Sequence, residues 1–220
     1  MLYHCAYNFP AVLLTLGPTA WEQLKPLHEK LVRDSRVKVR KTLAYSLFEL
    51  AKILGEDMTE SELLPVLFYF IKDVEEVREG VMISLPQFVE SLSELQRESY
   101  VEKISEAWVS GEDNWRKRAL QVEQMGQLAC LFPADVFAQH YLRQYFEMCE
   151  DQVASVRETA AKSCYLIAKS LNRNQSLIQS FVERVCAFKQ SRKYTMRQTF
   201  IVMCESVFRG DPKDQSMEAQ

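Results

Sequence analysis

The sequence predicts an all-α fold, an α-solenoid built from about five and a half helix-turn-helix repeats. Three observations lead to this prediction. Glycine is scarce, with only 6 in 220 residues, whereas strand-rich folds need glycine in their tight turns. Arginines in similar sequence contexts recur at nearly constant spacing along the chain, and a fixed period of this kind is typical of a repeat array. Apolar residues follow each of these arginines at helical spacing.

The recurring arginines define the register of the repeats. The sequence around three of them is alike, with SRVKVRKTLA, EEVREGVMI and ASVRETAAK. Offsets of +3, +7, +10 and +14 lie on one face of a helix, and at these offsets every residue is apolar except Gln121 and Asp211. This stripe predicts the second helix of each repeat, with its apolar face in the core. The arginines are Arg40, Arg78, Arg118, Arg157 and Arg197.

The opening segment, 1–17, fits the same register. Leu2 stands one repeat length before Arg40, and its four offsets select only apolar residues, Cys5, Phe9, Val12 and Leu16. We therefore expect this segment to form the second helix of a half repeat whose first helix is missing. Without that helix, the apolar face of the half repeat is expected to be uncovered, so that this end frays, self-associates or binds a partner.

The opening segment is a poor match to a signal peptide, because no basic residue precedes its apolar run and Pro10 interrupts it. No apolar run reaches the roughly 20 residues that a membrane span requires. We expect a protein of the cytoplasm, the nucleus or both.

The remaining elements follow in order. First helices are predicted at about 19–33, 60–72, 97–109, 134–149 and 175–189, and Pro18 and Pro133 suit the starts of two of them. Thr59 with Glu62 predicts a capping box at another. The polar, aperiodic tail 210–220 is expected to be disordered. The repeats then span about 18–56, 57–95, 96–132, 133–173 and 174–209, in a single array over 1–209.

The repeat length, together with an aspartate shortly before each arginine, resembles the HEAT repeat. Ser191 replaces the aspartate in the last repeat. In HEAT proteins the aspartates and arginines form a ladder of contacts between adjacent turns, so the resemblance implies a structural role for them. The predicted ladder residues are Asp34, Arg40, Asp73, Arg78, Asp113, Arg118, Asp151, Arg157 and Arg197.

Composition and residue spacing argue against catalysis. His4, His28 and His140 fall in different repeats, so they are not expected to share a site, and the six cysteines show no Cys-x-x-Cys spacing. We expect no catalytic residues, metal or cofactor, and interpret the cysteines as small core residues in a reducing compartment. A net charge of −3 provides no global basic field, so nucleic acids and membranes are not expected partners.

Basic and aromatic residues gather at the turns between the two helices of each repeat. Stacking of the repeats would place them along one edge, as a basic ridge that also carries Trp115. Two interpretations remain open at this stage. The ridge binds a partner protein, or its charges only pair with the acidic residues of the same turns. The acidic turn DVEEVRE at 73–79 would interrupt a phosphate track, which argues against nucleic acid.

Several stretches together resemble the regulatory subunit 1 family of protein phosphatase 4, which is related in architecture to the scaffold subunit of protein phosphatase 2A. They are YHCAYNFPAVLLTLG, VKVRKTLAYSLFELAKILG, DNWRKR, VASVRETA and RQTFIVMCESV. The resemblance implies a non-catalytic subunit that holds a Ser/Thr phosphatase catalytic subunit and helps to select its substrates. In that family the catalytic subunit contacts mainly the turns within repeats. The matching positions are Arg36, Lys38, Glu75, Trp115, Arg116, Lys193 and Tyr194.

Members of this family contain many more repeats than this chain. The resemblance therefore implies a truncated or shortened relative. A second functional hypothesis is a general HEAT-repeat adaptor in transport or complex assembly that does not bind a phosphatase.

Overall fold

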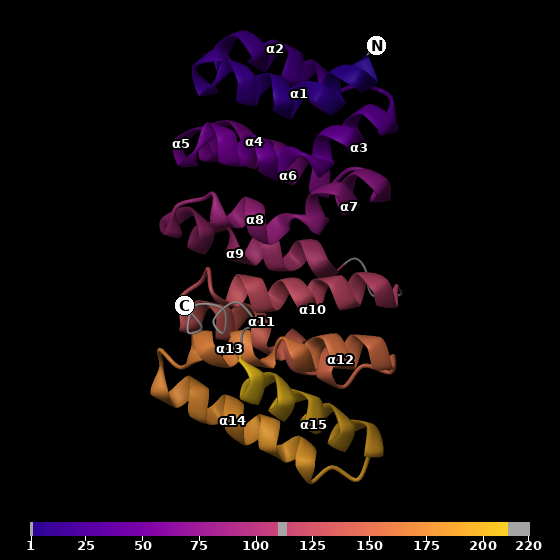
Figure 1. Ribbon diagram of the computed structural model, residues 1–220, viewed down its shortest axis with the longest axis vertical. Helices are drawn as coiled ribbons and strands as arrows, with labels where there is room; N and C mark the ends of the chain where they lie inside the picture. Colours follow the sequence, from indigo (N-terminus) through magenta and orange to yellow (C-terminus); the bar gives the residue numbers. More distant parts are fainter. Residues whose placement is uncertain (1, 110–113, 211–220) are drawn as a thin grey trace. The chain divides into compact units, whose positions relative to one another are not determined.

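The computed structural model describes residues 2–109 and 114–210, and helices account for most of them (Figure 1). No strand occurs among these residues. The contacts divide the chain into two compact units, Met1–Arg97 and Glu98–Gln220. Within each unit, helical hairpins stack on one another, which confirms the predicted all-α, solenoid class of fold.

In the first unit, each second helix packs against the second helix of the next hairpin, α1 against α3 and α3 against α7 (Figure 1). The first helices α2 and α6 cover one side of this row. The elements in chain order are α1 (Leu2–Leu16), the short 3₁₀ turn η1 (Pro18–Ala20), α2 (Trp21–Val32), α3 (Val37–Tyr45), α4 (Leu47–Leu54), α5 (Glu56–Met58), the π-helical turn η2 (Thr59–Leu63), α6 (Leu64–Ile71), α7 (Glu75–Ile83) and α8 (Leu85–Glu90).

The second unit repeats this arrangement, with α10 packed on α12 and α12 on α15. Its first helices α11 and α14 pack beside them. Helix α9 begins in the first unit and ends in the second. The elements are α9 (Glu94–Val109), α10 (Trp115–Ala129), α11 (Ala134–Cys149), α12 (Ala154–Lys162), α13 (Cys164–Leu171), α14 (Gln175–Lys189) and α15 (Tyr194–Arg209).

The apolar stripe that defines the register is the core of four repeats. After Arg40, Arg78, Arg118 and Arg157, all the stripe residues are buried. Burial of one such leucine or phenylalanine stabilises the fold by about 1.5 to 3 kcal/mol. A lone hairpin could not cover this stripe, so the stacked neighbours supply most of the stability. The prediction is confirmed for these repeats.

In α1 and α15 the stripe is displaced and only partly buried. In α1, Phe9 is buried as predicted, and the exposure of Val12 and Leu16 agrees with the uncovered apolar face expected of the half repeat. In α1, Val12 and Leu16 are 42% and 57% exposed, whereas Ala6 and Leu13 are buried. The contacts of α1 run to η1, α2, α3 and α4. All four elements come after α1 in the chain. They cover a narrower face of α1 than the face that is covered on a helix with neighbours before and after it.

Helix α15 shows the same displacement. Its buried residues are Met196, Thr199 and Met203, whereas Cys204 and Val207 of the predicted stripe are exposed. The contacts of α15 run to α12, α13 and α14. Because these neighbours lie on one side, the covered face shifts by one residue. Asp211, the last stripe position, lies outside the described residues.

Three second helices are interrupted at a serine six residues after the arginine, at Ser46, Ser84 and Ser163. The Ser46 hydroxyl donates to the carbonyl of Leu43 at 3.2 Å, and the Ser163 hydroxyl donates to that of Thr159 at 3.2 Å. Such back-bonding competes with the helix ladder and bends helices. After Ser84, the ring of Pro86 removes a further backbone donor.

The continuous second helices support this explanation. At the same position α10 has Gln124 and α15 has Met203, and both helices run unbroken. The predicted capping box at Thr59 is wrong, because the helical segment already begins at Glu56. The Thr59 hydroxyl is buried and donates to the Ala51 carbonyl, while the Glu62 carboxylate pairs with Lys25 at 2.7 Å.

A buried histidine lies in the first hairpin. The ring of His28 lies 5.1 Å from that of Trp21 and 5.4 Å from that of Phe9. Its Nε2 atom is buried and has no hydrogen-bond partner among the described residues. Burial lowers the pKa of His28 from 6.5 to about 4, because this apolar site disfavours the charged imidazolium. His28 is therefore neutral in the folded chain at neutral pH.

This burial predicts an acid-sensitive contribution to stability. The unfolded chain binds a proton at His28 below pH 6.5, whereas the folded chain does not until about pH 4. The free energy of unfolding should thus fall by about 2 kcal/mol between pH 7.5 and 5 through this residue. Urea unfolding of the wild type and His28→Leu at both pH values measures the difference. An equal pH response of the two proteins would contradict the prediction.

Candidate functional site

The predicted partner-binding residues all lie where a second helix begins. In the first unit, Arg36 is the N-cap residue of α3, Lys38 lies in its first turn, and Glu75 is the first residue of α7. We call these positions, together with those of the second unit described next, the turn edge.

In the second unit, Trp115 and Arg116 begin α10, whereas Lys193 is the N-cap residue of α15 and Tyr194 its first residue. Tyr194 is 68% exposed and Trp115 is 36% exposed. The guanidinium of Arg116 lies 4.7 Å from the centre of the Trp115 ring, a cation–π contact that fixes both side chains. Helix α12 packs against both α10 and α15, so the turn before α12 belongs to the layer between this pair and Tyr194.

An arginine joins consecutive turns of the first unit. Nη1 of Arg40 donates to the carbonyl oxygens of Asp34 at 2.7 Å and Ser35 at 3.2 Å, both in its own turn. Its Nε and Nη2 donate to the carboxylate of Asp73 in the next turn, at 2.6 and 2.8 Å. This side-chain hydrogen bond from Arg40 lowers the pKa of Asp73 below its usual range. One guanidinium thus fixes the spacing of two turns.

The second unit has the same contact. Arg118 donates from Nε and Nη2 to Asp151, at 2.6 and 3.1 Å. Burial by itself raises the pKa of Asp151, but the hydrogen bonds from Arg118 and the Val153 amide outweigh it and the pKa is lowered. Arg157 and Arg197 each donate from Nη1 to two carbonyls of their own turns. Asp113 lies outside the described residues, so its contacts with Arg78 or Arg118 are not described.

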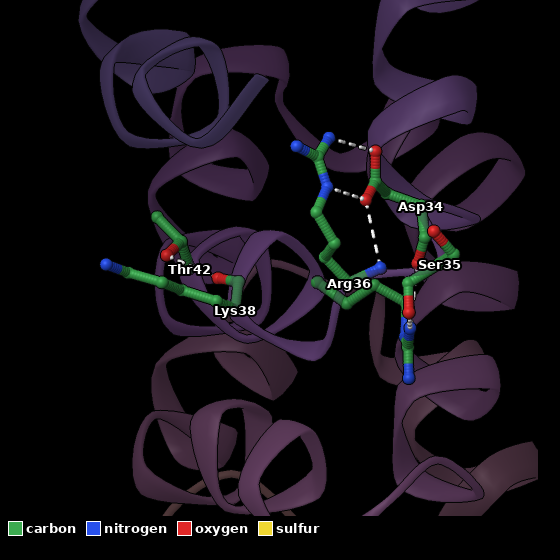
Figure 2. Close-up of polar contacts among 6 residues, drawn as sticks. Asp34, Ser35, Arg36, Lys38 and Thr42 are labelled. Carbon is green, nitrogen blue, oxygen red and sulfur yellow. Dashed lines mark hydrogen bonds and ion pairs between the residues drawn. The ribbon is translucent and has the colours of Figure 1, made fainter. Parts of the chain in front are cut away.

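Asp34 has a different partner. Figure 2 shows the Arg36 side chain turned back onto it, with Nε and Nη2 each 2.8 Å from a carboxylate oxygen. The Arg36 backbone amide also donates to this carboxylate, at 3.0 Å. The side-chain and backbone bonds from Arg36 lower the pKa of Asp34 to about 2. Arg36 is therefore partly committed to its own turn.

Lys38 points away from that pair, as Figure 2 shows. Its Nζ lies 4.2 Å from the centre of the Tyr3 ring of α1. Beside the same turn a hollow of about 520 Å³ opens, with the Arg40–Asp73 pair among its lining residues. Arg33 and Lys72 also line this hollow. Both turns thus present basic side chains around a fixed ion pair.

The placement of these charges is unfavourable for the helices themselves. The N-terminus of a helix carries a partial positive charge, so basic residues there destabilise it by a few tenths of a kcal/mol each. Nevertheless the first turns of α3, α10 and α15 contain no acidic residue. Only the turn of α7, with Glu75 and Glu76, has the favourable sign among these four. The first turns of α3, α10 and α15 therefore contain basic residues and no acidic ones.

Groups suited to catalysis or metal binding do not gather in the described part of the chain. Within residues 2–109 and 114–210 no group of three or more metal-ligating side chains could hold a metal ion. His28 is buried in the first hairpin, whereas His4 and His140 lie on α1 and α11. None of the helices described has the length and apolarity that a bilayer span requires.

The cysteine interpretation is correct for only part of the set. Cys149 and Cys164 are buried as expected, and burial raises the pKa of both thiols, that of Cys164 to about 11. Cys130, Cys186 and Cys204 are exposed. Their apolar neighbours in sequence suggested core positions, but Cys186 and Cys204 lie on exposed faces of α14 and α15, and Cys130 follows the end of α10.

Comparison with known proteins covers almost the whole chain. The model of the protein phosphatase 4 regulatory subunit 1 middle domain matches residues 5–107. Human and mouse serine/threonine-protein phosphatase 4 regulatory subunit 1 are each 38% identical to the chain over 223 residues, which cover 96% of it. The chain is thus a relative of protein phosphatase 4 regulatory subunit 1. It spans 23% of the length of these relatives.

A more distant relative and a solved structure agree with this result. Mouse serine/threonine-protein phosphatase 4 regulatory subunit 4 is 25% identical over 93% of the chain and 25% of its own length. A designed armadillo repeat protein superposes with a TM-score of 0.56 at 15% identity, over 94% of this chain and 90% of its own. The second likeness concerns the fold alone and supports the α-solenoid class.

Loss of the buried Arg40–Asp73 pair should lower the free energy of unfolding more than loss of an exposed ion pair. Arg40 and Asp73 have side chains only 13% and 9% exposed, so Asp73→Asn leaves a guanidinium without its counter-charge and should cost about 2 to 3 kcal/mol. Glu147→Gln is the control, since Arg143 and Glu147 are 88% and 53% exposed and their pair should contribute less than about 0.5 kcal/mol. Urea unfolding measures both, and equal losses would contradict the prediction.

The Arg40–Asp73 contact also predicts how the free energy of unfolding changes at acid pH. The pKa of Asp73 is lowered in the folded chain, so its contribution to stability is present above its ordinary pKa of 3.8 and is lost as the pH falls through the lower folded value. In Asp73→Asn this part of the acid response should be missing. Urea unfolding of both proteins at a series of acid pH values measures it.

Proposed function

We propose that this chain is a non-catalytic regulatory or scaffold module that binds the catalytic subunit of a protein phosphatase 4 type Ser/Thr phosphatase and helps to direct its substrate choice. The observation that carries the proposal is the 38% identity to serine/threonine-protein phosphatase 4 regulatory subunit 1 over 96% of the chain. The relatives are named as regulatory subunits, and the described residues contain no cluster of metal-ligating side chains of their own.

The helix starts of the turn edge, taken in each unit by itself, are the residues that we assign to the catalytic subunit. The basic side chains at the starts of α3, α10 and α15 do not stabilise those helices, which favours a role in binding. Trp115 and Tyr194 add large, partly exposed aromatic surfaces, the type of residue that dominates many protein interfaces. The complementary surface on the partner is expected to carry carboxylates around apolar pockets.

The geometry of the turns supports rigid presentation of these residues. The Arg40–Asp73 and Arg118–Asp151 pairs hold neighbouring turns at a fixed spacing. Asn114 caps α10 by accepting a hydrogen bond from the Arg116 amide at 3.0 Å, so the helix start that bears Trp115 is itself fixed. A pre-organised surface loses less conformational entropy on binding.

Alanine replacement at the turn edge tests the assignment. Trp115→Ala combined with Arg116→Ala should weaken binding of a purified protein phosphatase 4 catalytic subunit at least about 10-fold, and adding Lys193→Ala and Tyr194→Ala should weaken it further. Biolayer interferometry measures the affinity. Arg143→Ala on the outer surface of α11 is the matched control, because it removes an exposed positive charge far from any turn in sequence.

Two results would overturn parts of the proposal. If the folded wild-type chain does not co-purify with the catalytic subunit, the phosphatase assignment fails and a general HEAT-repeat adaptor becomes the better description. If binding occurs and all four alanine replacements leave it within twofold of the Arg143→Ala control, the turn edge is the wrong surface.

A further inference from the structure

A groove of about 710 Å³ lies between α1 and α3 in the first unit. Its α1 wall contains Tyr3, Tyr7 and Pro10, and its α3 wall contains Lys38, Lys41 and Tyr45. Helices α1 and α3 pack directly against each other, so the groove runs between neighbouring second helices. This surface is separate from the turn edge except at Lys38.

Three tyrosines make the groove suited to flat, apolar groups. Tyr7 is 67% exposed and Tyr45 is 36% exposed, so both rings are accessible from solvent. Exposed tyrosines bury large contact areas at little entropic cost when a partner binds. Pro10 and Ala11 extend the apolar wall between them.

A glycine in the neighbouring helix sets the position of Tyr45. A Cβ atom added at Gly80 of α7 would stand 2.7 Å from Tyr45 Cδ2 and 3.0 Å from the Ala44 Cβ. Gly80 is buried inside a helix, where glycine is destabilising by about 0.5 to 1 kcal/mol relative to alanine. The glycine lets the Tyr45 ring pack on α7 and present its other face to the groove.

The charges of the groove are separated. Lys38 and Lys41 lie in the first half of α3, and each ammonium rests near a tyrosine ring, at 4.2 Å from Tyr3 and 5.6 Å from Tyr45. Glu49 lines the opposite end, from α4. Burial, and after it the nearby charge of Glu79 in α7, raises the pKa of Tyr45, but Glu79 is not among the residues that line the groove. The lysine end of the groove therefore favours an anionic group of a ligand, and the Glu49 end favours a hydrogen-bond donor or a basic group.

We propose that this groove binds a short, extended segment of a partner protein in which a carboxylate side chain adjoins an aromatic or proline ring. The carboxylate lies between the two lysine ammonium groups, and the ring packs against Tyr7 and Ala11. A backbone amide or basic side chain of the segment faces Glu49. This site goes beyond the proposed contact with the phosphatase, because it provides an independent place for an acidic peptide.

The occupant follows from the combination of charge and shape. Two ammonium groups, 4.2 and 5.6 Å from tyrosine ring centres, give this end of the groove a positive charge that attracts an anion. A narrow aromatic wall beside them selects an anion carried next to a ring over a free inorganic ion. A single peptide segment can satisfy both ends of the groove at once.

A labelled peptide tests the proposal directly. The probe is the fluorescein-labelled peptide Gly-Ser-Glu-Glu-Tyr-Pro-Ser-Gly, and the matched peptide has two glutamines in place of the glutamates. By fluorescence anisotropy the acidic probe should bind at least about 10-fold more tightly than the glutamine peptide, and more weakly at high salt. Tyr7→Ala and Lys41→Glu should each weaken binding at least about 5-fold.

Controls keep this test independent of folding and of the phosphatase. Lys30→Glu on α2 reverses an exposed charge outside the groove and should change affinity less than twofold. Tyr7→Ala and Lys41→Glu should retain the thermal unfolding midpoint of the wild type within a few degrees and still bind the catalytic subunit. Peptide binding without phosphatase binding would overturn only the proposed function.

Three outcomes would overturn the groove proposal. They are no binding of the acidic probe below about 1 mM, equal binding of the acidic and glutamine peptides, and loss of affinity in Tyr7→Ala and Lys41→Glu no greater than in Lys30→Glu. The first of these, with normal binding of the phosphatase, would leave the turn edge intact as the partner surface.

Discussion

The arginine near the start of a second helix is the contact on which the arrangement of the turns depends. Arg40 uses one nitrogen for two carbonyls of its own turn and two nitrogens for a carboxylate of the next. Apolar packing alone would allow neighbouring hairpins to slide, because the hydrophobic effect has no direction. The guanidinium fork has a fixed geometry, so it sets the register of the layers. The starts of α3 and α7 in the first unit, and those of α10 and α12 in the second, take their spacing from such a contact.

Most of the fold follows from one period in the sequence. The offsets of the apolar residues predicted the second helices and their core faces, because a helix packed on both sides buries a stripe that the sequence must supply. The two outermost described helices depart from this rule, since their buried faces depend on how many neighbours are present. The breaks at Ser46, Ser84 and Ser163 have a visible signal, a serine six residues after the arginine. A serine at this position does not by itself predict a break, because the effect depends on whether its hydroxyl donates to a carbonyl of the preceding turn.

The candidate site was predicted less completely. Position in the repeat was sufficient to place Trp115 and Tyr194 at helix starts, since turns are fixed by the register. The pairing of Arg36 with Asp34 fits the alternative in which ridge charges pair with acidic residues of the same turns, but the sequence does not single out Arg36, because the contact depends on a side-chain rotamer. The groove also escaped the sequence argument, although Tyr7 and Tyr45 are one repeat length apart and so occupy equivalent positions of consecutive second helices. A search for aromatic residues at the repeat spacing would have found this pair.

The turn aspartates have two separable tasks, and Ser191 retains only one of them. Asp73 and Asp151 accept a backbone amide that shapes their own turn and also bind the arginine of the preceding hairpin. Ser191 accepts the Lys193 amide at 3.2 Å but offers no carboxylate to Arg157. The turns of the α11–α12 and α14–α15 hairpins therefore lack the guanidinium–carboxylate contact of the earlier joint. The polar link between these two hairpins lies elsewhere, at Ser206 of α15, whose hydroxyl donates to the Lys162 carbonyl at 2.7 Å and accepts from the Tyr165 amide at 3.3 Å. Under an applied bending force, the turns of this joint should separate more easily than the turns joined by Arg118 and Asp151, because only the latter are tied directly to each other.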